Sequence, residues 1–171
     1  AKTITYNDDG TTSEKLEEDG RTTTTIKDAK GNIVSVTVVE GDKTVETVYG
    51  ENGKIVTETI GENKTIYNYD KDGKTLLSKI EIKGDIRTEY EYKKDENGND
   101  VVIKKFNGET TTTVTDSKGN KISEIVVKSD GSKVEITYDE NGREKERVET
   151  NKDSTTTYQY SDGKLISKTV I

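Results

Sequence analysis

Short runs of Val, Ile, Thr and Tyr recur along the whole chain, with polar residues between the apolar ones and clusters of Gly, Asn and Asp between the runs. Residues two apart in a strand share a face, so this alternation predicts half-buried β-strands. No segment of ten or more residues has the apolar spacing of a helix. The pattern therefore predicts an all-β chain of about 16 strands, each about six residues long.

A turn that ends in glycine recurs every 20 to 25 residues, in phrases such as YDKDG and YDENG. Asp and Asn bond to the local backbone and Gly adopts the positive φ of such turns, so these phrases predict hairpins. A second, less regular set of turns, such as EEDG and KSDG, divides each of the eight units into two strands. The turn glycines that set the register are Gly10, Gly31, Gly53, Gly73, Gly98, Gly119, Gly142 and Gly163.

The faces of these strands follow from the turns. We expect the residue before each turn Asp to pair with the first residue after the Gly, so that the two share a face. The third residue after the Gly lies two positions further along the strand and is therefore on the same face. The tyrosines before the turns are Tyr6, Tyr49, Tyr69 and Tyr138. The third residues are mostly aliphatic, with Ser13 and Lys145 as exceptions, and are Val34, Val56, Leu76, Val101, Ile122 and Ile166. One face should be aromatic and apolar. The other, rich in Thr, Ser, Lys and Glu with a few exceptions such as Ile33, Ile55 and Leu165, should be solvated.

Sixteen strands at a spacing of ~4.8 Å exceed the ~10 strands of most open sheets, so we expect an elongated antiparallel meander that twists or coils. A β-solenoid with one unit per coil is the alternative, because a period near 22 residues also permits it. Turn signals at both ends of every unit favour the hairpins. We predict one repeat-array domain over residues 1–171, with a bulge or a longer loop at residues 93–100.

The composition limits the classes of function. Only 27% of the residues are apolar and 36% are charged, which disfavours a thick core. The net charge of −7 comes from interleaved Lys and Glu without a basic patch, so we expect no nucleic-acid partner. No apolar run approaches the ~20 residues of a membrane span, so we also expect no span.

The chain has no His and no Cys, which excludes Ser-His-Asp and Cys-His catalysis and the common zinc and haem sites. The carboxylate pair Asp8-Asp9 lies in a turn, where Asp is frequent for conformational reasons. The loops DKDG and DENG lack the later Glu ligand of an EF-hand loop. We expect no enzyme, no metal site and no cofactor.

Three phrases of the chain, GSKVEITYDENGR, KTIYNYDKDGKTLLSK and STTTYQYSDGKLISK, resemble the tyrosine-aspartate (YD) repeats of the Rhs family. Tyr-Asp itself occurs at Tyr69-Asp70 and Tyr138-Asp139, and Arg follows the turn glycine at Arg143. The resemblance implies a β-shell or spiral in a bacterial secreted or cell-surface protein. A weaker resemblance is to the single-layer sheets of spirochaete outer-surface lipoproteins, and idealised turns are also typical of a designed β-repeat.

The chain begins on one strand pattern, KTITY, and ends on another, KLISKTVI, so either longer sequence has been cut away or these ends join. Bare edge strands invite pairing with another chain, so we expect self-association through the end strands, into filaments. The expected function is a structural or adhesive element in an extracellular or cell-surface location. The alternatives are a surface module that binds a glycan or a protein, and a designed sheet scaffold without a natural function.

Overall fold

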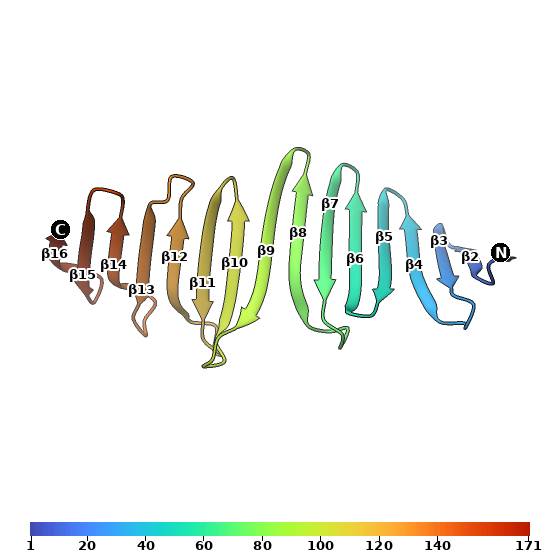
Figure 1. Cartoon of the computed structure of the whole chain (residues 1–171), viewed down its shortest axis with the longest axis horizontal. Helices are drawn as coiled ribbons and strands as arrows, with labels where there is room; N and C mark the ends of the chain where they lie inside the picture. The colour runs from blue at the N-terminus through green and yellow to red at the C-terminus, as the bar shows by residue number, and fades with distance from the viewer. The chain divides into compact units, whose positions relative to one another are not determined.

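The computed structural model describes all 171 residues and contains strands and turns without a helix. The predicted all-β class is confirmed. Backbone contacts divide the chain into two units, residues Ala1–Arg87 and Thr88–Ile171. Each unit is a series of antiparallel hairpins (Figure 1). The single repeat-array domain over residues 1–171 stays a prediction.

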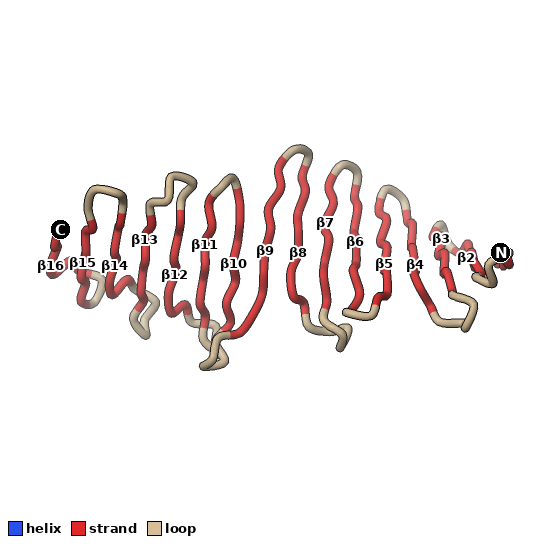
Figure 2. Tube along the Cα trace, viewed as in Figure 1, coloured by secondary structure: helices blue, strands red, loops and turns tan.

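Eight strands belong to the first unit, and the turns that join them alternate between the two ends of the strands (Figure 2). They are β1 (Lys2–Tyr6), β2 (Thr12–Glu18), β3 (Arg21–Lys27), β4 (Ile33–Glu40), β5 (Lys43–Gly50), β6 (Gly53–Ile60), β7 (Asn63–Tyr69) and β8 (Leu76–Lys83). The other eight strands follow, and the first of them begins just before the boundary of the second unit. They are β9 (Ile86–Lys94), β10 (Asp100–Phe106), β11 (Glu109–Thr115), β12 (Lys121–Val127), β13 (Lys133–Tyr138), β14 (Glu144–Thr150), β15 (Thr155–Ser161) and β16 (Lys164–Val170).

The hydrogen-bonded order of the strands follows the chain from β1 to β16, in a 16-stranded sheet that does not close on itself. Strands that are neighbours in the sequence are therefore neighbours in the sheet, as tight hairpin turns require. The predicted antiparallel meander is confirmed, and the β-solenoid alternative is wrong.

All eight glycines predicted to set the register have a positive φ, between +70° and +127°. The predicted pairing across the turns is wrong by one residue at several of them. Lys27 pairs with Ile33, the second residue after Gly31, because the backbone N–H of Asp28 already donates to the Asn32 carbonyl at 2.8 Å inside the loop. The first pair of the strand ladder therefore forms one residue later than predicted.

In several hairpins, the strand after the turn contains a one-residue register shift. The shift compensates for the error in the predicted pairing, so the third residue after the glycine lies on the expected face. Between β3 and β4 the shift lies at Ile26/Lys27, so Val34 shares the face of Lys27. The β1–β2 hairpin has no shift, and Ser13 pairs with Thr5 on the face opposite to Tyr6. The β9–β10 hairpin also has no shift, and Val101 pairs with Lys93 on the face opposite to Lys94.

One extra residue between Gly73 and Gly98 lengthens the turn after β7, where the backbone N–H of Asp70 donates to the Thr75 carbonyl at 2.9 Å. The others lie in β8 and β9 and not in a bulge or a longer loop at residues 93–100. Lys94 pairs with Asp100 and Lys93 with Val101 in continuous register. β9 has nine residues and is longer than the other strands. The prediction of a bulge or longer loop there is wrong, because longer strands accommodate the additional residues within the ladder.

Each unit is a single layer of strands with very little core. Val101 and Ile136 are the only buried apolar side chains, with 8% and 7% of their surface exposed, and no polar side chain is buried. Most other apolar side chains are half-buried by their neighbours on the same face. Cross-strand contacts of about 0.2–1 kcal/mol each, spread over many pairs, therefore carry most of the packing energy.

Candidate functional site

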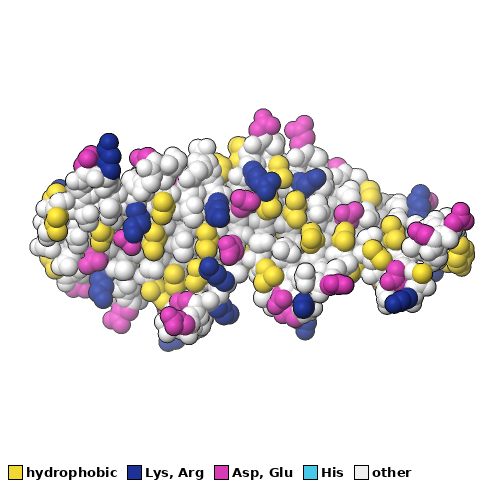
Figure 3. Space-filling model, viewed as in Figure 1, with side chains coloured by type: hydrophobic (Ala, Val, Ile, Leu, Met, Phe, Trp, Pro, Cys, Tyr) yellow, Lys and Arg dark blue, Asp and Glu magenta, His cyan; other side chains and the backbone are white.

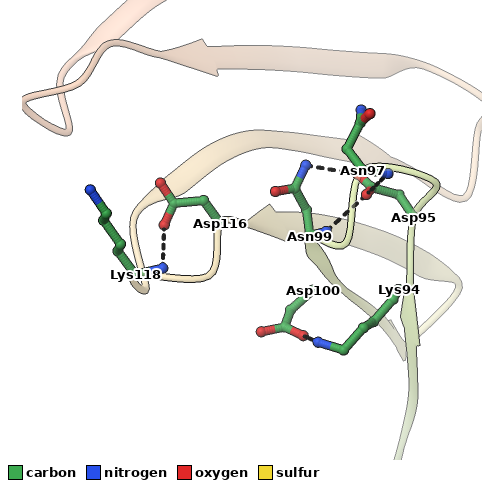
Figure 4. Close-up of polar contacts among 7 residues, drawn as sticks. All are labelled: Lys94, Asp95, Asn97, Asn99, Asp100, Asp116 and Lys118. Atoms are coloured by element: carbon green, nitrogen blue, oxygen red, sulfur yellow. Dashed lines mark hydrogen bonds and ion pairs between the residues drawn. The ribbon is translucent and has the colours of Figure 1, made fainter.

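The loops between strands are built around Asp carboxylates that bind the backbone of their own turn. In the loop after β9, Oδ1 of Asp95 accepts hydrogen bonds from the backbone N–H groups of Asn97 and Asn99, both at 2.9 Å (Figure 4). Nδ2 of Asn99 donates to Oδ2 of Asp95 at 3.0 Å. The backbone N–H of Gly98 donates to the Asp95 carbonyl at 3.1 Å. These bonds fix the loop without a ligand.

The same geometry recurs at three other turns, where an Asp accepts from the backbone N–H groups two and four residues ahead. These aspartates are Asp28, Asp116 and Asp139. The backbone N–H four residues ahead of the Asp is the main cause that lowers the pKa of Asp28, Asp95 and Asp116 below the ordinary value of 3.8. The carboxylates thus serve the turn, since hydrogen bonds to the charged form stabilise it.

Metal binding has no obvious location on this chain. No group of three or more Asp and Glu side chains is placed to hold a metal ion. Next to the Asp95 loop, the Asp100 carboxylate is engaged by the Lys94 ammonium at 2.6 Å (Figure 4). Hard cations such as Ca²⁺ need six to eight oxygen ligands, and these loops supply few that the turn does not already use.

We expect the turn carboxylates to make the fold acid-sensitive. Their pKa values lie below 3.8 in the folded chain, so they stabilise it above pH 3.8 and this contribution is lost as the pH falls through the folded pKa. At about pH 7, the triple variant Asp28→Ala, Asp95→Ala, Asp116→Ala should have a lower urea midpoint of unfolding than the parent. The difference between the two midpoints should become smaller at about pH 2.5.

The matched control is Asp8→Ala, in the first turn, where Asp9 and not Asp8 accepts the hydrogen bonds. Its urea midpoint should be close to that of the parent at both pH values. The same gap between the triple variant and the parent at both pH values would contradict the assignment, because the effect would then come from the loss of side chains and not of charge.

Tyrosines stand near the strand ends and are partly covered by lysines from the neighbouring strand. Nζ of Lys54 lies 4.8 Å from the ring centroid of Tyr69, and Nζ of Lys121 lies 5.3 Å from that of Tyr138. Burial raises the pKa of Tyr138 above its ordinary value of 10.0. Tyr6, by contrast, is 77% exposed. Lysine–aromatic pairs of this kind contribute roughly 0.5–1 kcal/mol at exposed positions and hold neighbouring strands together.

The structure brings most of the predicted apolar residues onto the tyrosine side of their own unit. In the first unit, Val56 lies on the face of Tyr49, and Leu76 pairs directly with Tyr69. In the second unit, the alternation along β12, β14 and β16 places Ile122, Lys145 and Ile166 on the face of Tyr138, while Val101 lies on the other face. A shallow pocket next to Ile122 and Tyr138 is open to solvent.

The apolar residues of the opposite face were largely missed. In the first unit Ile26, Val48 and Ile55 form a row on the face predicted to be solvated, and each exposes more than a third of its surface. Figure 3 shows apolar side chains in short rows between charged ones on the face in view. The signal for this row was present in the sequence, since Ile55 was a clear exception to the polar pattern.

Comparison of the chain with protein-family models and with curated proteins finds no match. The resemblance to the tyrosine-aspartate repeats of the Rhs family stays a prediction. The structure also has no helix long and apolar enough to cross a membrane.

The end strands each carry one row of backbone groups without a partner in the sheet. Thr155 and Ile171 exchange both backbone hydrogen bonds at 2.9 Å, so in an antiparallel ladder the backbone N–H groups of Lys168 and Val170 point away from β15. Ala1 and Glu17 exchange bonds in the same way, at 3.0 and 2.9 Å. The backbone of Lys2 and Ile4 therefore points away from β2.

Proposed function

We propose that this chain is a non-catalytic structural or adhesive β-repeat element that acts outside the cell and associates with further chains by strand addition at β1 and β16. The observation that carries the proposal is the open backbone edge of β16, which is exposed along its whole length. Strand addition gives affinity through main-chain hydrogen bonds and specificity through alternate side chains.

The side chains of β16 favour this proposal. Ile166, Val170 and Ile171 expose 64%, 61% and 86% of their surface, and Leu165 exposes 53%. Soluble proteins usually protect edge strands with Pro, inward charges or a covering element. β16 has no Pro and carries Lys164 and Lys168 as its only charged side chains. The ladder of β16 with β15 has a register shift next to Ile166, but residues 167–170 pair in continuous register. The outward edge of this regular stretch is a template for another strand.

Lys168→Pro should weaken strand addition at β16 and leave the sheet intact. Proline removes the outward N–H of Lys168, which is not used in the ladder with β15, and edge positions tolerate proline. We expect the self-association constant to fall by about tenfold or more, since one outward main-chain donor is lost and the proline ring hinders the approach of the added strand. Sedimentation velocity over a wide concentration range, with negative-stain images of the same samples, measures this.

The matched control is Lys168→Ala, which removes the lysine placed 5.5 Å from the Tyr158 ring but keeps the backbone donor. It should associate like the parent. Urea midpoints of both variants should stay close to that of the parent, which shows that β16 remains folded. Association of the Lys168→Pro chain at parental strength would contradict strand addition at this edge, as would a parent that stays monomeric at the highest concentration.

A further inference from the structure

We propose that the first unit docks a second copy of this chain face to face, through the side of its sheet that is turned away from the tyrosines. This inference is independent of strand addition at the edges. The surface, called the Thr/Ile face below, consists of the alternate residues of β3 to β8. They are Thr22, Thr24, Ile26, Ser35, Thr37, Val39, Thr44, Glu46, Val48, Ile55, Thr57, Thr59, Lys64, Ile66, Asn68, Ser78, Ile80 and Ile82.

The two faces of this unit differ sharply in charge. Glu46 and Lys64 are the only charged side chains of the Thr/Ile face. The opposite side of the same six strands carries Arg21, Lys27, Glu40, Lys43, Lys54, Glu58, Lys79, Glu81 and Lys83. Charged residues are depleted in the centres of interfaces because their desolvation is costly. The Thr/Ile face is therefore the one suited to be covered.

Aliphatic side chains are concentrated in two adjacent rows of the Thr/Ile face, where small polar residues such as Ser35 separate some of them. Across the sheet, Ile26 pairs with Ser35, Ser35 with Val48, and Val48 with Ile55. Ile26, Val48 and Ile55 are 38%, 39% and 46% exposed. Ile66 pairs with Ile80 in the adjacent row. The Thr and Ser residues between them are small and uncharged, so a second sheet can approach at the ~10 Å distance of packed sheets.

The exposed area matches what a stable dimer buries. The chain of 19.0 kDa exposes 11819 Å². A compact protein of this mass exposes about 8,400 Å², so roughly 3,400 Å² is in excess of the usual value. Six strands of about seven residues span roughly 29 Å by 23 Å, or about 670 Å² in projection, close to the ~800 Å² per partner of a standard interface. One Thr/Ile face is thus large enough for a specific contact.

The two charges are complementary under a two-fold axis parallel to the strands and between β5 and β6. This axis places β5 over the partner's β6 and β4 over the partner's β7, so Val48 lies over the partner's Ile55. Glu46 is then displaced from the partner's Lys64 by one strand across the sheet and by two residues along the strand. The two long side chains can span this displacement and form an ion pair. Neither Glu46 nor Lys64 has an ion-pair partner within its own chain.

Ile55→Lys tests the docking surface, and Ile60→Lys is its matched control. Both isoleucines belong to β6, with similar exposures of 46% and 42%, but Ile60 lies on the tyrosine side. In the full chain, sedimentation equilibrium should show a dimer for the parent and for Ile60→Lys. Ile55→Lys should weaken the dimer by about a hundredfold, because it buries two unpaired ammonium groups at the symmetric interface.

Charge exchange tests the orientation of the two copies. Glu46→Lys and Lys64→Glu should each weaken the dimer by about tenfold, and the double variant should regain most of the loss, because the ion pair is re-formed with reversed signs. A parent that stays monomeric, or a dimer that Ile55→Lys and Ile60→Lys affect equally, would overturn the docking surface. Failure of the double variant to recover would overturn the two-fold arrangement.

Lys168→Pro separates this inference from strand addition. The face-to-face dimer should persist in Lys168→Pro, and end-to-end growth should persist in Ile55→Lys. If Lys168→Pro removes all association and Ile55→Lys removes none, the Thr/Ile face is not an interface while strand addition stands. The reverse result supports the face and contradicts the edge.

Discussion

Gly53→Ala is expected to destabilise the fold by about 3 kcal/mol or more, a large share of the 5–15 kcal/mol of a typical domain. Gly53 has a φ of +127°, a backbone conformation that residues other than glycine rarely adopt. A Cβ on this residue would clash with the Tyr69 carbonyl oxygen and would lie 3.0 Å from the Asp70 carbonyl carbon. Because both atoms belong to the backbone of the next hairpin, the turns must move apart.

Gly20→Ala is the matched control for this prediction. Gly20 also has a positive φ, of +78°, but a Cβ there would have no atom within 4 Å. We expect a loss of about 1 kcal/mol, from backbone conformation alone. Urea unfolding of both variants, followed by circular dichroism, measures the difference. Equal losses for the two variants would show that the close approach of the two turns does not contribute.

The strands and turns could be predicted because their chemistry is local. Asp and Gly specify a turn through hydrogen bonds and φ values within five residues, as in the loop from Asp95 to Asn99. Alternation of apolar and polar residues then defines each strand. Chain order and tight turns leave the meander as the simplest sheet, which is the order observed from β1 to β16.

The faces could be predicted only in part, because they depend on the register beside each turn. A single residue moves every side chain of a strand to the other face. Because of the register shift at Ile26/Lys27, Val34 lies on the predicted face. The hairpins that contain Ser13 and Val101 have no shift, so these two residues lie on the opposite face. These hairpins share similar loop sequences, such as KDAKG and KDENG. The choice between them is made by pairing along the whole strand, which the turn residues do not encode.

The Thr/Ile face was missed for a different physical reason. Thr is frequent both on solvated strand surfaces and in tightly packed ones, so a Thr-rich pattern alone does not distinguish them. The distinction comes from the distribution of charge between the two faces. That distribution becomes visible only when the pairing places Glu46 between Thr37 and Thr57, and Lys64 opposite Thr59, and leaves the other charges of β3 to β8 on the tyrosine side.

Ile136→Ala is expected to destabilise the second unit by about 3 kcal/mol, because it removes one of the two side chains that this chain buries. Ile136 is 7% exposed and lies between Glu124 and Arg147 on the neighbouring strands. Arg147 is held by Glu144 and Glu149 at 3.0 and 2.9 Å, so its side chain is not free to fill the space left behind.

Ile166→Ala is the control for Ile136, since it makes the same truncation on the same face at a residue that is 64% exposed. Its cost should stay below about 1 kcal/mol, because little buried area is lost. Urea unfolding gives the two free energies, and hydrogen exchange of the β13 amides locates the effect. If Ile136→Ala costs no more than Ile166→Ala, the stability of this sheet is carried evenly by its cross-strand pairs, and burial at Ile136 has no special weight.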